Sequence, residues 1–244
     1  MSLRSRAVEL ILREGISDVR ELSERLDVSP ERLRRALRGV SGLSIDGERV
    51  RSEVRLRGYV EVRGARPVLL TAPHAQGPGA DVFTGEIAWW VARIAGCHAL
   101  IATVSRRSRL PGEDRPADYN REWTRDTPFR RRISELVEER GIRFIVDLHG
   151  MESDPVRPEI DVGALGGEAA RGELVAKVVE RLEECGFDVG FEQEFCGGDI
   201  LEYHCDGRRV QGLQLELSEE LREIDEYRGI LAVLVVVNTL LGEL

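Results

Sequence analysis

Two of the four histidines in the sequence follow apolar segments that are typical of buried strands. His74 comes after VLLTAP, and His149 comes after FIVDL. A histidine at the end of a strand places its imidazole at the rim of a sheet, where neighbouring strands can share a metal ion. Zinc favours histidine nitrogens together with a carboxylate, and a catalytic site keeps one position for water. The pair predicts a metal site; the alternative is two ordinary loop histidines bonded to backbone groups.

Acidic residues near both histidines could complete this site. Asp81 and Glu86 follow His74 closely enough to reach the same point, so the spacing alone leaves the third ligand open. Asp147 lies two residues before His149, and we expect its side chain on the opposite face of the strand.

The segment 105–127 is polar and rich in arginine. Its arginines are Arg106, Arg107, Arg109, Arg115, Arg121 and Arg125. A guanidinium presents a planar fork of donors to a carboxylate, and Asn120 beside Arg121 can add further donors. A loop longer than about 15 residues is uncommon unless it has a function. We therefore expect this segment to bind a carboxylate; the alternative is a solvated surface loop.

Glu216 stands near the end of a predicted strand, VQGLQLELS. Alternation places Leu213, Leu215 and Leu217 on one face of this strand, and Gln214 and Glu216 on the other. Burial of a carboxylate disfavours its charged form and raises its pKa, which suits a general base. The alternative is an ion pair between Glu216 and one of the many arginines.

Elements that can position these residues alternate along the chain from Val54 onward. The predicted strands are 55–62, 67–71, 99–104, 144–148, 160–165 and 210–217. The predicted helices are 84–94, with Thr84 as its cap, 128–140, 168–185 and 226–241. This order predicts an α/β domain over residues 55–244, with a mostly parallel or mixed sheet and helices on both faces. Ligands of such sheets bind beyond the carboxyl ends of the strands.

Residues 1–54 have a different pattern and are predicted to form a separate domain. Three short helices, 4–13, 19–26 and a third after Ser29-Pro30, precede a hairpin around Asp46-Gly47. This order resembles a winged helix-turn-helix, in which the third helix would read DNA. Nucleic acid is therefore a candidate partner of this domain; the alternative is a helical cap or a module that docks a protein.

The composition of the whole chain excludes several classes of protein. The net charge is −9 and the pI about 5.2, which argues against nucleic-acid binding by the chain as a whole. Apolar runs stay below the ~20 residues that span a bilayer, and the charged N-terminus is not a secretory signal. We expect a cytoplasmic protein without a membrane partner. Arginine makes up all the basic residues except Lys177, which is typical of a GC-rich genome. Asn and Gln are scarce and charged residues are plentiful, which is typical of a thermophile.

The four cysteines and the absence of familiar motifs narrow the chemistry further. Cys97, Cys185, Cys196 and Cys205 form no C-x-x-C pair, so we expect plain buried thiols. A disulfide among the last three is the alternative in a hyperthermophile. The sequence contains no G-x-S-x-G, P-loop or H-E-x-x-H pattern.

Four segments, in order, resemble motifs of the N-formylglutamate amidohydrolase family. They are TAPHAQG, RPADYNR, IVDLHG and GLQLELS, and the resemblance covers roughly residues 66–242. Ala75-Gln76 departs from the Ser or Gly that usually follows the first histidine, and the first 55 residues have no counterpart. The family consists of zinc amidohydrolases related in fold to the zinc carboxypeptidases, so the resemblance implies that phosphorylase/hydrolase-like fold.

The resemblance also implies a metal site. His74 and His149 would bind zinc. Asp81 would be the third ligand, by analogy with a stretch of a phage poly-γ-glutamate hydrolase that resembles residues 84–88, and Glu86 remains the rival.

For the reaction, the resemblance implies that Arg121 with Asn120, and Arg115 beside them, would bind the substrate carboxylate. Glu216 would act as the general base. The expected activity is zinc-dependent hydrolysis of an amide bond in a small, carboxylate-bearing acyl-amino acid or peptide-like substrate. The alternative is a DNA-binding regulator whose hydrolase-like domain senses a metabolite. The oligomeric state stays open.

Overall fold

The computed structural model describes residues 3–11, 16–38, 40, 43–52, 58–110 and 114–244. The chain divides into two compact units, Met1–Tyr59 and Val60–Leu244, and each unit is described by itself. Within the described residues, no helix is long and apolar enough to cross a bilayer.

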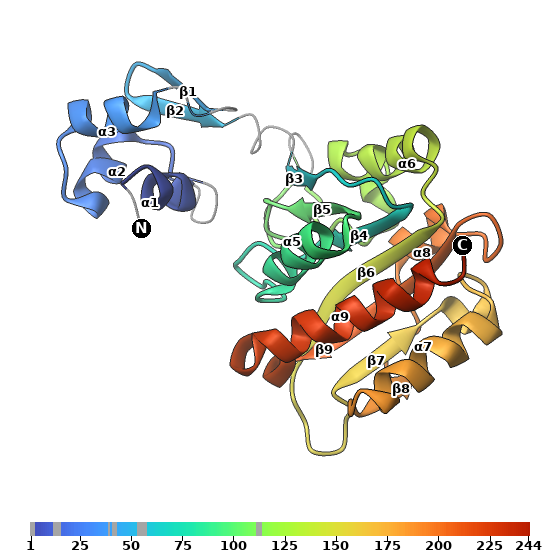
Figure 1. The fold of residues 1–244 in the computed structure, drawn as a ribbon. Helices are drawn as coiled ribbons and strands as arrows, with labels where there is room; N and C mark the ends of the chain where they lie inside the picture. The colour runs from blue at the N-terminus through green and yellow to red at the C-terminus, as the bar shows by residue number, and fades with distance from the viewer. Residues whose placement is uncertain (1–2, 12–15, 39, 41–42, 53–57, 111–113) are drawn as a thin grey trace. The chain divides into compact units, whose positions relative to one another are not determined.

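The described part of the first unit contains three helices followed by a hairpin (Figure 1). The elements are α1 (Leu3–Glu9), α2 (Val19–Leu26), α3 (Pro30–Leu37), β1 (Leu43–Asp46) and β2 (Arg49–Ser52). Side chains of Asp18 and Ser29 accept hydrogen bonds from the first-turn amides of α2 and α3, as Asp and Ser at a helix N-cap do. Asp46 pairs with Arg49, so the turn of the hairpin lies at 47–48, one residue later than predicted. The end of the first predicted helix, residues 12–13, lies outside the described residues.

The second unit is built on one seven-stranded sheet. In sequence its strands are β3 (Tyr59–Val62), β4 (Val68–Ala72), β5 (His98–Ala102), β6 (Phe144–Met151), β7 (Ile160–Gly163), β8 (Val189–Phe191) and β9 (Gln211–Ser218). Their spatial order is β3-β5-β4-β6-β9-β7-β8. Strand β4 runs parallel to β5 and β6, β6 runs parallel to β9, and β7 is antiparallel to β9. The carboxyl ends of β4, β6 and β9 therefore meet at one edge of the sheet.

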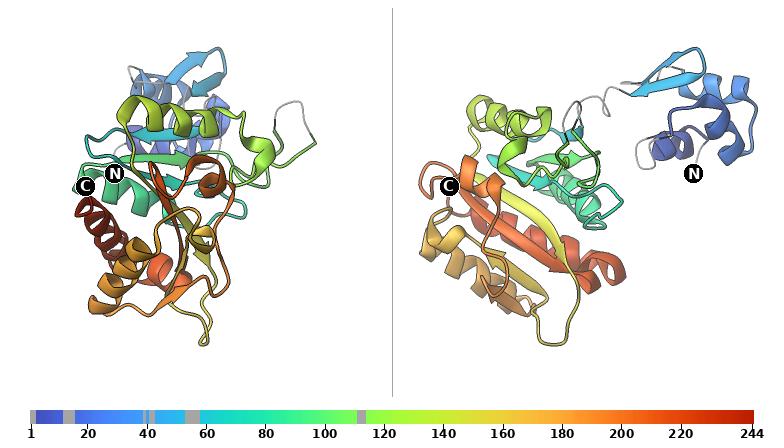
Figure 2. Two further views of the ribbon diagram at one scale, coloured as in Figure 1. Left: turned by 90° about the vertical axis from the view of Figure 1, so that its right-hand side faces the viewer. Right: turned by 180° about the vertical axis from the view of Figure 1, so that it is seen from behind.

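Helices cover both faces of this sheet (Figure 2). They are α5 (Thr84–Ala95), α6 (Pro128–Arg140), α7 (Gly172–Glu184), α8 (Asp199–His204) and α9 (Glu226–Leu241). On one face, α9 packs between α5 and α7 (Figure 1), and buried residues of all three join one apolar core with Val146, Leu148 and Leu215. On the other face, α8 packs against α6, β6 and β9. The α/β fold with a mostly parallel sheet is as predicted.

Most predicted elements of this unit are present, with some corrections. Helices α6 and α9 have the predicted bounds, whereas α7 begins at Gly172 rather than at 168, and β8 and α8 were not predicted. The prediction that Thr84 caps α5 is wrong. Phe83 occupies that position, and the Thr84 hydroxyl donates to the carbonyl of Asp81 at 2.7 Å.

The cysteines are free thiols. Cys97 is buried, but Cys185 and Cys196 are exposed, so the expectation of buried thiols is wrong for those two.

Candidate metal centre

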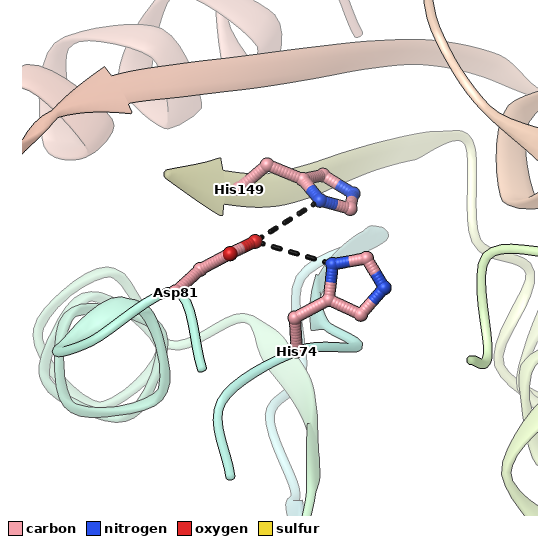
Figure 3. A group of neighbouring side chains, drawn as sticks. All are labelled: His74, Asp81 and His149. Carbon is pink, nitrogen blue, oxygen red and sulfur yellow. Dashed lines mark hydrogen bonds and ion pairs between the residues drawn. The ribbon is translucent and has the colours of Figure 1, made fainter. Parts of the chain in front are cut away.

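His74, Asp81 and His149 converge at the shared edge of β4 and β6 (Figure 3). His74 follows β4, Asp81 precedes α5, and His149 lies on β6. Their ligand atoms all lie within 4.8 Å of one another, and all three residues are buried. Asp81 Oδ2 is 3.2 Å from Nδ1 of His74 and 3.4 Å from Nδ1 of His149. Glu86, the rival third ligand, is not part of this cluster.

Local hydrogen bonds to backbone carbonyls hold Asp81 opposite the two imidazoles. The Asp81 amide donates to the carbonyl of His74 at 2.9 Å, which closes the loop between them. The amide and hydroxyl of Thr84 both donate to the carbonyl of Asp81, which ties the loop to the start of α5. Phe83 between them has a φ of +66°, in the left-handed region that non-glycine residues seldom occupy.

Two further carboxylates, those of Asp118 and Asp147, contact the two histidines from the other side of each ring. Nε2 of His74 is 2.7 Å from Asp118 Oδ1, and Nε2 of His149 is 2.8 Å from Asp147 Oδ2. The hydroxyl of Thr71 donates to Asp147 at 2.5 Å. Metal-binding histidines commonly donate their second ring N–H to such a carboxylate, which leaves the other nitrogen free for the metal. This donor set therefore fits a metal ion held by both Nδ1 atoms and Asp81.

The expectation that Asp147 points away from His149 is wrong. Side chains two residues apart on a strand lie on the same face. The spacing of Asp147 and His149 could therefore have identified this carboxylate from the sequence.

The charges of the site reinforce one another. Burial would raise the pKa of Asp81, but His149 and His74 lower it well below the ordinary value of a carboxyl group. Burial likewise opposes the shift of Asp118, whose pKa falls to about 2 through its contacts with His74, Asn120 and Arg121. Burial would lower the pKa of His149, but nearby carboxylates, with Asp147 first, raise it well above the usual value. The clustered carboxylates thus favour a positive charge, on the histidines or on a bound cation, at the centre of the site.

Glu216 lies beside His149. The two residues are register partners on the adjacent strands β6 and β9. Glu216 is buried, and Gln214 Nε2 donates to its Oε1 at 2.8 Å. Burial and the charges of Asp81 and Asp147 raise the pKa of Glu216, although His149 opposes them. Among the described residues its hydrogen-bond partner is Gln214 and not an arginine, which disfavours the structural ion pair.

The predicted carboxylate-binding residues lie at different distances from this cluster. Asn120 Nδ2 is 3.2 Å from His149 Nε2, so Asn120 lines the site. Arg121 is largely exposed, and its Nε is 3.3 Å from Asp118 Oδ2. Arg115 is exposed, and within the described residues no contact joins its side chain to the cluster.

Arg106 was not singled out from the arginines of its segment, yet it reaches the cluster. Its guanidinium nitrogens are 3.3 Å from His74 Nδ1 and 3.4 Å from Asp81 Oδ1. Arg106 lies four residues after β5, the parallel neighbour of the strand that precedes His74, but its local spacing does not distinguish it from the other arginines of the segment.

The fold and this cluster together define an α/β protein with a candidate metal centre at the carboxyl ends of its strands. Residues 115–222 match the family model of N-formylglutamate amidohydrolase, which confirms the resemblance and indicates a hydrolase of the amidohydrolase class. The match includes Asn120, Arg121, His149 and Glu216, whereas His74 and Asp81 precede it. A search of curated proteins found no match.

Solved structures agree on the fold. The crystal structure of N-formylglutamate amidohydrolase from Ralstonia eutropha JMP134 is 16% identical, covers 75% of this chain and 97% of that chain, and has a TM-score of 0.59. A gene product of Agrobacterium tumefaciens is 14% identical, covers 79% and 97% of the two chains, and has a TM-score of 0.55. At these identities the similarity shows a common fold.

Proposed function

We propose that the protein is a zinc-dependent amidohydrolase that acts on a small acyl-amino acid or peptide-like amide bearing a carboxylate. The single observation that carries this proposal is the orientation of the two imidazoles. Both turn Nδ1 toward Asp81 and Nε2 toward a second carboxylate, Asp118 or Asp147. The family match to residues 115–222 supports the amide as the bond that is cleaved.

The chain's own residues can carry the proton transfers. Zinc held by His74, Asp81 and His149 would lower the pKa of water and polarise the amide carbonyl. Glu216 takes a proton from the attacking water as the new C–O bond forms, and gives that proton to the leaving nitrogen as the C–N bond breaks. Its raised pKa suits both the basic and the acidic role.

Substrate binding falls to the segment that holds Asn120 and Arg121. Arg121 is exposed enough to contact a ligand, and its Nε donates a hydrogen bond to Asp118 Oδ2. A bidentate guanidinium–carboxylate pair would fix the orientation of the scissile amide. Arg115 is a further candidate from the same segment. A cation in the site would repel Arg106, which would then be available to an anionic group of the substrate.

Zinc removal and restoration tests this function. We expect hydrolysis of N-acylated glutamate to disappear with a chelator and to return with zinc, and amides without a carboxylate to be poorer substrates. Arg121→Lys should reduce the preference for substrates that bear a carboxylate over those that do not, because lysine cannot form the bidentate pair. Hydrolysis that persists in zinc-free protein would contradict the proposal.

For the first unit, we propose a winged-helix-like module, supported by three helices followed by a hairpin. Arg32, Arg35 and Arg38 are exposed on or next to α3, the helix that would face DNA.

A regulator that senses a metabolite is the second candidate function; it does not require a base such as Glu216. A gel-shift assay with and without the substrate tests this candidate. The cytoplasmic location and the thermophilic origin stay predictions from composition.

A further inference from the structure

Arg222 is a buried arginine that has no part in the proposed chemistry. It lies in the short helical segment Glu220–Ile224 after β9, and its side chain is 6% exposed. Burial of a charged group is costly unless it is compensated by partners. Here the guanidinium donates to three backbone carbonyls: Leu217 at 3.0 Å, Val82 at 2.7 Å and Met151 at 3.3 Å. Glu223 lies beside it, with its carboxylate 3.4 Å away.

These three carbonyls belong to the segments that carry Asp81, His149 and Glu216. Val82 follows Asp81, and Leu217 follows Glu216. Met151 ends β6, two residues after His149. A single guanidinium therefore links the turn of the acidic ligand to the ends of both strands that carry the second histidine and the base.

The backbone around Arg222 is shaped to admit its guanidinium. Gly150 pairs with Leu217 in the sheet, and a Cβ at position 150 would lie 2.5 Å from the guanidinium carbon. Any larger residue would therefore displace the group that binds the three carbonyls.

The turn that Arg222 holds is strained. Phe83, next to Val82, has a φ of +66°, and a non-glycine residue in this region persists only where its surroundings hold it. The hydrogen bond from Arg222 to Val82 is one such restraint, and it acts one residue from Asp81.

We propose that Arg222 is a positioning residue that holds the Asp81 turn against the ends of β6 and β9. The role in metal binding rests on the proposed function, whereas the restraint on the turn does not. The matched control is Arg132, which is 12% exposed and binds Glu61, Glu135 and Glu139, none of them a site residue.

Hydrogen exchange of the full-length, chelator-treated protein tests the restraint directly. In Arg222→Met we expect amides 81–84 to exchange about tenfold faster or more, because this turn opens locally. Arg132→Met should leave them unchanged. Wild-type exchange of these amides in Arg222→Met would overturn the proposal. If Arg222→Met does not fold, Gly150→Ala displaces the guanidinium instead and should accelerate the same amides; unchanged exchange there would also overturn it.

Zinc titration of the same proteins tests the consequence for the site. We expect Arg222→Met to weaken zinc binding by about 10–100-fold, the range for residues that orient ligands. Arg132→Met should bind zinc as the wild type does. If Arg222→Met showed faster exchange but bound zinc as tightly as the wild type, Arg222 would not position Asp81 for the metal. That result would overturn the proposed role in metal binding. A wild type that binds no zinc would reject the proposed function, while the exchange result would still decide the restraint.

Discussion

Which side chains meet at the site follows from strand geometry at the scale of single residues. Asp147 and His149 lie on one face of β6, and their register partners Gln214 and Glu216 lie on the same face of the sheet in β9. Register then brings Glu216 next to His149. The same alternation sends Leu213, Leu215 and Leu217 into the apolar core on the other face. One strand thus supplies both the core and the proposed base.

Glu216→Gln tests the proposed base. Glutamine keeps the shape of the side chain but removes the basic oxygen, so kcat should fall by about 10²–10⁴-fold, the usual contribution of general base catalysis. Zinc content should stay normal. Activity of the wild type should fall as the pH drops through the raised pKa of Glu216, and this acidic limb should be missing in the variant. The measurement is kcat per folded, zinc-loaded protein across pH; a near wild-type kcat would reject the role.

At the scale of elements, the sequence predicted strands and helices better than the connections between them. Helices α6 and α9 were predicted within their observed bounds, because Pro128 marks the start of α6 and the apolar run before Gly242 marks the end of α9. The short elements β8 and α8 carry too few residues for a periodic pattern. Arg106 was not singled out because its segment holds six arginines, and local spacing does not show which of them contacts His74.

Gly198, at the start of α8, determines where Asn120 can lie. A Cβ at position 198 would be 2.1 Å from Asn120 Nδ2, and the amide of Ile200 donates to Asn120 Oδ1 at 3.0 Å. We expect Gly198→Ala to displace Asn120 from His149 and to lower kcat/KM by up to about 100-fold, as small misplacements do. Gly172→Ala is the control, since a Cβ there meets nothing within 4 Å. Equal kinetics of the two variants would contradict this role.

At the scale of the whole molecule, the chain combines two units with separate apolar cores. The second unit contains every residue of the candidate site. Strands β4, β6 and β9 are consecutive neighbours in its sheet. This order brings together site residues that are distant in the sequence, such as His74 and Glu216, which are 142 positions apart. That order could not be predicted from the sequence, because the pattern of each strand predicts the strand but not which strands it pairs with.

Removal of residues 1–52 should leave metal content and turnover nearly intact, because no residue of the candidate site lies there. Zinc content and kcat of the truncated protein, compared with the full chain, check this expectation. A truncated protein that folds and binds zinc but does not turn over substrate would show that the first unit contributes to the site.

The most direct test of the account is the zinc content of variants of the His–Asp–His cluster. Protein purified without chelator should contain about one zinc per chain by elemental analysis, as expected for a site with three protein ligands. His149→Ala and Asp81→Asn should lose that zinc, whereas Glu86→Gln, which alters the rival carboxylate outside the cluster, should retain it. Full zinc occupancy in His149→Ala, or loss of zinc in Glu86→Gln alone, would contradict the account.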